Sequence, residues 1–245
     1  MIASLAMYDL MALQGANDRL WQGIRSHLGH GPDALTRDED LWGIWQSPDL
    51  LLAQTCGMPF RTRLHPDVTL VGTPDYGLPD CPPGYYNSVL VVHADAKGQQ
   101  IQDFSGGRFA YNEPLSQSGW AAPMTHLDAA KVRFSVLVQT GAHANSARAV
   151  AEDGADIAGL DALTWLLLQD HNPKLTDQLR VLETTTPTPA LPYITAAGRD
   201  PAPIACAFRA ALADLAPVDR DALHLKGLVD IPAPVYLAVE TPFTP

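Results

Sequence analysis

The chain has 245 residues, a length that fits one large domain or two smaller lobes. Hydrophobic residues make up 47% and charged residues 18%, so the chain can build a core and is not disordered. Its formal net charge of −11 argues against a nucleic-acid-binding protein and against docking on an anionic membrane, because both need a basic surface. The charge does not argue against a small anionic ligand, which backbone N–H groups can bind locally.

The cysteines and the N-terminal residues indicate in which cellular compartment the protein is expected. Cys56, Cys81 and Cys206 are too few and too scattered for a disulfide framework or a Cys-rich zinc site. No run of about 18 apolar residues predicts a membrane span. A secretory signal needs a basic start and an apolar stretch, and the first residues offer neither. The sequence therefore indicates a cytoplasmic protein or one from which a signal peptide has been removed.

Strand and helix patterns alternate from the N-terminus onward. Residues 2–7 form a predicted strand, and 13–28 carry apolar side chains at spacings of three and four, which is typical of a helix. Further predicted strands cover 50–53, 68–72, 86–93, 108–111, 132–139, 156–160, 179–183 and 193–197. Further predicted helices cover 41–45, 119–130, 143–153, 162–171, 201–215 and 219–225, and the tail is Pro-rich. This alternation predicts an α/β fold with mixed, mostly parallel sheets and helices on both faces.

Several predicted strands end in small polar residues. Tyr8-Asp9, Gln54-Thr55, the 116–119 segment, the 141–143 segment and Asp161 all stand at such ends. Ligands of open α/β sheets bind outside the carboxyl ends of strands. Together these ends predict one shared cleft, and the alternative is a set of unrelated polar caps.

The segment from Asn112 to Gly119 is the strongest local signal of a binding site. A strand ends there, and Ser116, Gln117 and Ser118 precede a predicted helix. The free N–H groups and partial positive charge of a helix start suit the oxygens of phosphate, sulfate or carboxylate. The alternative is a plain helix cap formed by Ser118.

His143 and Asp161 stand at two more strand-to-helix turns. His143 follows Gly141 and could donate a hydrogen bond to an anion or a polar ring. Asp161 could accept one from a protonated phosphate or an amine. The alternatives are a surface histidine and an N-cap for helix 162–171. Four tyrosines at strand ends or loops could line a ligand cleft or simply pack: Tyr8, Tyr76, Tyr85 and Tyr86.

No catalytic signature accompanies these residues. Ser118, His143 and Asp161 lack a Gly-x-Ser-x-Gly elbow, and their chain order matches none of the common triads. Cys56 lacks the local sequence of a known nucleophile. There is no phosphate loop, no dinucleotide glycine pattern and no paired-ligand spacing for a metal. The sequence therefore predicts no enzyme activity, no cofactor and no metal, and replacing Cys56 by Ala is expected to leave function intact.

A set of segments, in order over nearly the whole chain, resembles the phosphate/phosphonate-binding family of ABC-transporter substrate-binding proteins, a branch with the type II periplasmic-binding-protein fold. The segments are 5–9, 51–57, 85–91, 103–112, 116–119, 141–143 and 154–161. The resemblance implies two lobes with a ligand cleft between them. Lobe one would be 1–88 plus 194–245 and lobe two 89–193, with 88–93 and 191–196 crossing between the lobes.

The resemblance also implies a site and a role. Ser116, Gln117 and Ser118 match the turn that grips phosphonate oxygens, with Gly119 beside them, and His143 and Asp161 match the family's cleft histidine and aspartate. Tyr8 and Tyr85 or Tyr86 match its cleft tyrosines, and Thr55 joins the expected ligand-binding set. The expected role is capture of a phosphate- or phosphonate-type anion, either for an ABC-transporter permease or as a solitary sensor.

Two other functions remain as alternatives at this stage. Some relatives of the type II fold bind or act on pyrimidine precursors of thiamine, and an aromatic pocket near Cys56 would fit such a ligand. The other alternative is a scaffold that binds no small molecule.

Overall fold

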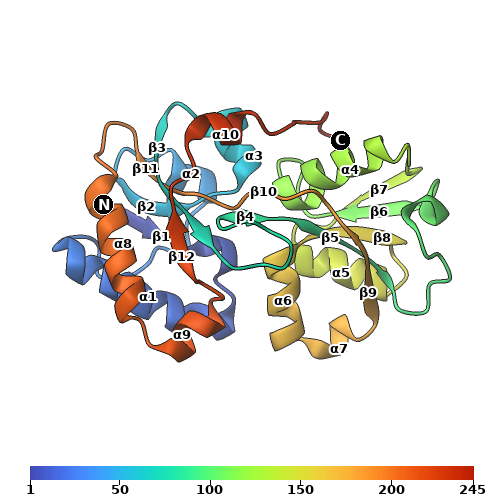
Figure 1. Ribbon diagram of the computed structural model, residues 1–245, viewed down its shortest axis with the longest axis horizontal. Helices are drawn as coiled ribbons and strands as arrows, with labels where there is room; N and C mark the ends of the chain where they lie inside the picture. The colour runs from blue at the N-terminus through green and yellow to red at the C-terminus, as the bar shows by residue number, and fades with distance from the viewer. The chain divides into compact units, whose positions relative to one another are not determined.

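The computed structural model describes residues 1–245. The chain divides into two compact units: unit 1 contains residues 1–85 and 189–238, and unit 2 contains residues 86–188 and 239–245. The chain leaves unit 1 within β4 (Tyr85–Tyr86) and returns within β10 (Thr188–Pro189), and these two strands pair with each other. Each unit has its own five-stranded sheet (Figure 1).

The sheet of unit 1 has the strand order β1-β2-β11-β3-β12. β1 pairs with β2 in parallel, whereas β11 runs antiparallel to both β2 and β3, and β12 runs antiparallel to β3. Every residue of β2 is buried, which explains its unbroken apolar run in the sequence. The strands are β1 (Ile2–Ser4), β2 (Leu50–Gln54), β3 (Val68–Asp75), β11 (Tyr193–Ala196) and β12 (Gly227–Val229).

Helices α1 and α8 lie side by side in unit 1 (Figure 1). They approach closely where Gly23 faces Ala211, because a Cβ on Gly23 would lie 3.0 Å from the Cβ of Ala211. Leu20 and Ile24 of the predicted stripe are buried. The helices and helical turns of unit 1 are η1 (Ala6–Tyr8), η2 (Met11–Leu13), α1 (Gln14–Leu28), α2 (Leu41–Trp45), α3 (Gly57–Pro59), η3 (Phe60–Leu64), α8 (Ala202–Asp214), α9 (Pro217–Ala222) and α10 (Ala233–Leu237).

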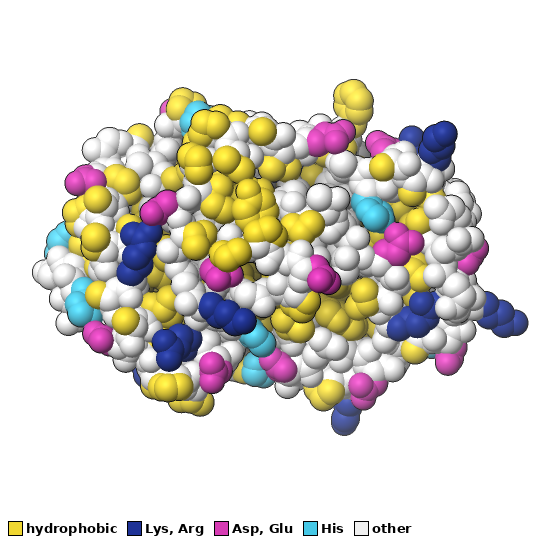
Figure 2. Space-filling model, in the orientation of Figure 1, with side chains coloured by type: hydrophobic (Ala, Val, Ile, Leu, Met, Phe, Trp, Pro, Cys, Tyr) yellow, Lys and Arg dark blue, Asp and Glu magenta, His cyan; other side chains and the backbone are white.

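A second apolar layer of unit 1 centres on Phe60 and Tyr236, whose rings meet edge to face at 5.2 Å. Tyr236 lies on α10, and its hydroxyl donates to the carbonyl of Ala190 at 2.8 Å. The outer side of α10 stays apolar, since Leu237 is 43% exposed. Figure 2 shows hydrophobic side chains gathered over the region where Figure 1 labels α10.

The sheet of unit 2 has the order β7-β6-β8-β5-β9. β6 runs parallel to β7 and β8, and β5 runs antiparallel to β8 and β9. Its core packs Phe109 of β6 with Leu90, Trp120 and Ile157. The strands are β5 (Ser88–His93), β6 (Arg108–Tyr111), β7 (Val136–Gln139), β8 (Ile157–Asp161) and β9 (Leu179–Thr184).

The helices of unit 2 connect these strands. η5 runs directly into α4, because Ala122 at the junction keeps helical dihedral angles. The C-terminal residues belong to this unit as well, and the indole N–H of Trp120 donates to the carbonyl of Phe243 at 2.9 Å. The elements are η4 (Ile101–Phe104), η5 (Gln117–Ala121), α4 (Ala122–Ala129), α5 (His143–Ala151), α6 (Ala162–His171) and α7 (Pro173–Thr176).

The structure confirms the α/β fold and differs from the predicted elements in detail. β7 covers only the second half of the predicted strand 132–139, because Lys131 takes a left-handed φ of 58° and Val132 bonds back to Leu127. β1 stops at Ser4, and Ala6–Tyr8 forms a helical turn instead. The Pro-rich tail contains β12 and α10, which the sequence does not predict.

The sheets are mixed, with more antiparallel pairing than the alternation of strands and helices predicts. The reason is that β5 and β11, the strands that follow the two passages between the units, run antiparallel to their neighbours.

None of the helices combines the length and the hydrophobicity that crossing a bilayer requires.

Candidate functional site

One edge of the unit 2 sheet gathers the carboxyl ends of its parallel strands. Tyr111 at the end of β6 pairs with Gln139 at the end of β7, and β8 runs parallel to β6 and ends at Asp161. The loops and helix starts that follow therefore share this edge. Two of the five predicted strand ends, Tyr8-Asp9 and Gln54-Thr55, lie in unit 1 instead.

The turn after β6 begins the helix formed by η5 and α4. Ser116 is in an extended conformation, and its hydroxyl oxygen accepts a hydrogen bond from the N–H of Gly119 at 2.9 Å. Ser116 therefore caps this helix, which corrects the interpretation of Ser118 as the cap. Ser118 lies inside the first turn and is 3% exposed.

His143 lies next to this turn. The Oγ atom of Ser118 is 3.2 Å from Nε2 of His143, the first residue of α5. A Cβ added to Gly119 would lie 1.9 Å from Oδ1 of Asn112 and 3.1 Å from Cε1 of His143. One atom of this cluster is buried without a hydrogen-bond partner, Oδ1 of Asn112. The structure thus brings together Ser116, Ser118, Gly119 and His143, and it adds Asn112.

Burial lowers the pKa of His143 from its usual value of 6.5, because the charged imidazolium would lose its hydration. The negative charge of Asp161 and a hydrogen bond with the backbone of Gly159 both raise the pKa of His143, but they do not reverse the shift. His143 is therefore neutral at pH 7, with one N–H donor and one acceptor nitrogen.

This shift predicts a pH dependence of folding. Because the pKa of His143 is lower in the folded protein, the unfolded chain binds more protons just below pH 6.5. The contribution of this residue to stability is complete above about pH 6.5 and declines as the pH falls below it. We expect His143→Gln to lose less unfolding free energy than the wild type between pH 7 and 5.5, measured by urea denaturation.

The exposed His30 provides the control for this measurement. His30→Gln is expected to follow the wild-type pH profile. An unchanged profile in His143→Gln would contradict the assignment of the pH effect to this residue.

Asp161 caps α6, and its Oδ1 accepts a hydrogen bond from the N–H of Thr164 at 2.8 Å. The carboxylate is 2% exposed and close enough to His143 to act on its pKa. Asp161 therefore serves the local helix as an N-cap and also belongs electrostatically to the same cluster. Ser88 pairs with Asp161 across β5 and β8, and its buried hydroxyl has no hydrogen-bond partner.

The other predicted site residues lie mostly in unit 1. The Tyr8 ring meets the Tyr76 ring edge to face at 5.5 Å, and the Tyr76 hydroxyl accepts a hydrogen bond from Nε2 of Gln54 at 2.8 Å. Thr55 follows β2, is fully buried, and its hydroxyl has no hydrogen-bond partner.

The two neighbouring tyrosines fall in different units. Tyr85 is half-buried in unit 1, whereas Tyr86 is buried in unit 2. The sequence places both in the first lobe; in the structure the boundary between the compact units falls between them.

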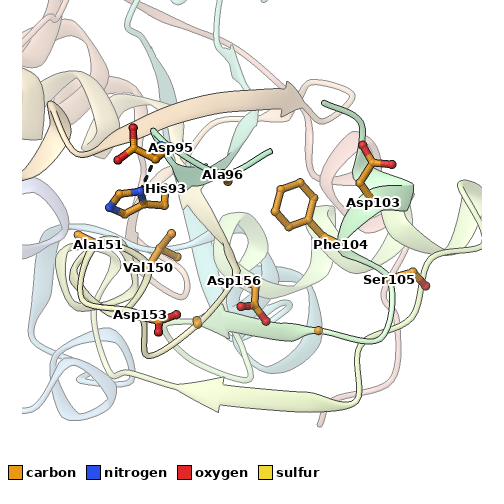
Figure 3. Close-up of a pocket in the computed structure, with 12 residues that line it drawn as sticks. His93, Asp95, Ala96, Asp103, Phe104, Ser105, Val150, Ala151, Asp153 and Asp156 are labelled. Carbon is orange, nitrogen blue, oxygen red and sulfur yellow. Dashed lines mark hydrogen bonds between the residues drawn. The ribbon is translucent and has the colours of Figure 1, made fainter. Parts of the chain in front are cut away.

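A cavity of about 600 Å³ opens at the opposite edge of the unit 2 sheet (Figure 3). It is lined by residues that precede β6 and β8, such as Gly107 and Asp156, and by His93 at the end of β5. Its polar groups bond within the protein: Asp156 accepts from Arg108 at 2.8 Å, and Nδ1 of His93 accepts from the N–H of Asp95 at 3.2 Å. Because these groups are engaged, the cavity is a weaker candidate than the Ser118 cluster.

Sequence reasoning did not name Asn112 or Ser88 as site residues, although Asn112 begins the segment that it singled out. Asn112 is the first residue after a strand, which is the same signal that identified Gln54-Thr55. Ser88 gave no such signal, because it is the first residue of β5 and not a residue that follows a strand. β5 runs antiparallel to β8, so the start of β5 lies beside Asp161 at the end of β8. In the structure, no three His, Cys, Asp or Glu side chains come together as a metal site.

Solved structures with the same fold cover nearly the whole chain. PhnD1 from Prochlorococcus marinus, solved in complex with methylphosphonate, is 17% identical with a TM-score of 0.72, and the match covers 96% of this chain and 92% of that one. A Xanthomonas citri protein bound to chloride is 14% identical with a TM-score of 0.71, at 96% and 92% coverage. A binding protein component of an ABC phosphonate transporter from Pseudomonas aeruginosa is 16% identical with a TM-score of 0.69, at 93% and 80% coverage. At these identities the likeness shows the fold.

The family of the chain is identified from its amino-acid sequence, by comparison with known families. No curated protein matches the chain. The profile described as the phosphonate periplasmic substrate-binding protein of ABC transporters matches residues 52–231. The family consists of proteins that bind small-molecule solutes rather than of enzymes. With most of its length matched, this chain belongs to the family of phosphonate substrate-binding proteins of ABC transporters.

Proposed function

We propose that unit 2 binds the anionic end of a phosphate- or phosphonate-type ligand at the turn formed by Ser116, Gln117, Ser118 and Gly119. The observation that carries this proposal is the Ser118 hydroxyl, which is buried in the first turn of a helix beside His143. The helix start adds a partial positive charge and backbone donors. Membership of the phosphonate-binding family supports the same class of ligand.

The surrounding acceptors favour a ligand that carries a proton. Asn112 contributes a buried carbonyl oxygen without a partner, and Asp161 contributes a buried carboxylate. A monoprotonated phosphonate offers one O–H group to such an acceptor and unprotonated oxygens to the donors at the helix start. A sulfonate has no such proton at neutral pH and would leave the Asn112 carbonyl unpaired.

The remaining predicted residues are proposed as further ligand contacts. In unit 1 the buried Thr55 hydroxyl lacks a partner, which supports a role in hydrogen bonding to a ligand. Tyr8 and Tyr85 are half-buried, and with Tyr86 they would contact its organic part through their ring faces.

The partner follows from the family. A substrate-binding protein of an ABC transporter hands its ligand to a permease, and we propose such a permease as the partner of this chain. A solitary sensor would bind the same ligand without that partner.

Ser118→Ala is expected to weaken the binding of methylphosphonate by about 10- to 100-fold. A hydrogen bond to a charged oxygen contributes about 1.5–3 kcal/mol, and about 1.4 kcal/mol corresponds to a factor of ten. Isothermal titration calorimetry measures the change directly. The matched control is Ser105→Ala, since Ser105 is exposed and lies beside the cavity at the other edge of unit 2. If Ser118→Ala binds as tightly as the control, the anion does not contact this hydroxyl.

A thermal-shift panel tests the ligand class. Phosphate and methylphosphonate are expected to raise the melting temperature, and sulfate and a methylsulfonate are expected to raise it less. Stabilisation by a thiamine-type pyrimidine alone would overturn the proposal and favour an aromatic ligand. No stabilisation by any of these compounds would favour a scaffold.

A further inference from the structure

Strand β7 forms one edge of the unit 2 sheet, and its outer side has no neighbouring strand (Figure 1). In a parallel pair, alternate residues of a strand direct their N–H and C=O groups to the neighbour, and the residues between them direct both groups away. The N–H of Thr140, just after β7, donates to the carbonyl of Tyr111 on β6 at 2.9 Å, which sets the phase of this alternation. Leu137 and Gln139 therefore point their N–H and C=O groups outward.

β7 lacks the features that keep an exposed strand edge from pairing. Such edges are usually protected by charged side chains, by proline or by a covering loop. β9, at the other end of the same sheet, has this protection, because Arg180 donates to the carbonyl of Ala96 at 3.0 Å and Glu183 adds a second charge. The sequence of β7 is Val-Leu-Val-Gln, and Val136 and Leu137 are 46% and 43% exposed. Another strand can therefore add to this edge.

The strand that fits this edge is a second copy of β7 in antiparallel orientation. When Val138 faces its own copy across a two-fold axis, Leu137 of each chain lies opposite Gln139 of the other. Each of these two pairs exchanges both hydrogen bonds of an antiparallel ladder, so every outward group of the two strands is paired. The order of donors and acceptors is thus self-complementary, as a two-fold dimer requires.

The charges around β7 fit the same orientation. Lys131 and Arg133 precede the strand, and Asp128 offsets one of these charges by bonding to Arg133 at 2.6 Å. Glu113 lies at the other end of β7, where it accepts a hydrogen bond from the side chain of Gln139 at 3.2 Å. Antiparallel pairing brings the basic end of one copy to the acidic end of the other. This local attraction counteracts the repulsion between two chains that each carry a net charge of −11.

We infer that β7 is an interaction surface through which unit 2 pairs with a second copy of this chain, so that two five-stranded sheets become continuous. Because β7 has only four residues, the association is weak, and the dimer forms as the protein concentration rises. The inference is independent of the ligand and of the turn proposed to bind it.

Sedimentation equilibrium over a wide range of protein concentration measures the association. The wild-type mass is expected to rise from 26.4 kDa, the mass of one chain, toward twice that value. Gln139→Pro removes an outward N–H and leaves the ladder to β6 intact, so the dimer loses two hydrogen bonds. The dissociation constant of the dimer is therefore expected to rise about 10- to 100-fold.

Val138→Lys tests the two-fold arrangement, because it places two like charges opposite each other at the axis. We expect it to weaken the association about five- to tenfold. The matched control is Val181→Lys on β9, since Val181 is 39% exposed at the other edge of the same sheet. The control is expected to associate as the wild type does.

Cross-linking tests the register of the two strands. Facing residues of a non-hydrogen-bonded antiparallel pair have Cα atoms about 4.5 Å apart, which a disulfide can span. Val138→Cys, combined with Cys206→Ser to remove the exposed native thiol, is expected to give a reducible two-chain species after oxidation with diamide. Val181→Cys in the same background is expected to remain a single chain.

A wild-type protein that keeps the mass of one chain at every concentration would overturn the inference. A dimer that neither Gln139→Pro nor Val138→Lys weakens would overturn it too, as would equal cross-linking at positions 138 and 181. Circular dichroism and a melting experiment establish that the variants fold. Should Gln139→Pro fail to fold, the comparison of Val138→Lys with Val181→Lys decides the matter.

Discussion

Gly119→Ala is expected to weaken anion binding by about 100-fold while leaving a folded protein. The added Cβ would lie 1.9 Å from Oδ1 of Asn112, far inside van der Waals contact, so Asn112 must move. The same carbon would press on Cε1 of His143 at 3.1 Å, and the N–H of Gly119 also donates to the cap residue Ser116. The change therefore displaces several groups of the turn at once, and a loss of about 3 kcal/mol of hydrogen bonding to the ligand corresponds to this factor.

Gly43→Ala is the matched control for this substitution. Gly43 lies in the short helix α2 of unit 1, and the nearest atom to an added Cβ is 3.8 Å away. Its affinity for methylphosphonate, measured by calorimetry, is expected to equal that of the wild type. Wild-type affinity in Gly119→Ala would show that the ligand does not depend on the geometry of this turn.

Phe109→Ala is expected to lower the free energy of unfolding by about 3–5 kcal/mol, the range found when a large aromatic side chain is removed from a core. Phe109 is fully buried in β6, and its ring lies 5.2 Å from that of Phe134. It also packs against the backbone of the neighbouring strand, since its Cζ lies 3.2 Å from the Cβ position of Gly159. The variant leaves a cavity between the sheet and its covering helix that rigid neighbours fill only in part.

Urea denaturation measures this loss, with Leu137→Ala as the control. Leu137 is on the same sheet but is 43% exposed, so its truncation is expected to cost no more than about 1 kcal/mol. Similar losses in the two variants would show that β6 does not form the centre of the unit 2 core.

The sequence by itself determined the fold class, the family and most of the elements. The spacing of the stripe that contains Leu20 and Ile24 indicated an amphipathic helix, and the unbroken apolar run 50–53 indicated a buried strand. These patterns are local and depend on the spacing of side chains along the chain, so they can be recognised without knowledge of the fold. The ends of strands also predicted the residues around Ser116, His143 and Asp161 as candidate site residues.

Only the tertiary structure decided which of these residues meet, and in what role. Whether Ser116 or Ser118 caps the helix depends on the backbone angle at which the chain leaves β6, and neighbouring serines give the same sequence signal for both. The unpartnered carbonyl of Asn112 and the hydroxyl of Ser88 become visible only when β6, β8 and β5 are set side by side. The structure of the C-terminal segment likewise depends on residues far away in the chain. β12 forms by pairing with β3, and the carbonyl of Phe243 accepts a hydrogen bond from the indole N–H of Trp120. Contacts between residues far apart in the chain leave no periodic trace in either segment, and for that physical reason the sequence could not predict them.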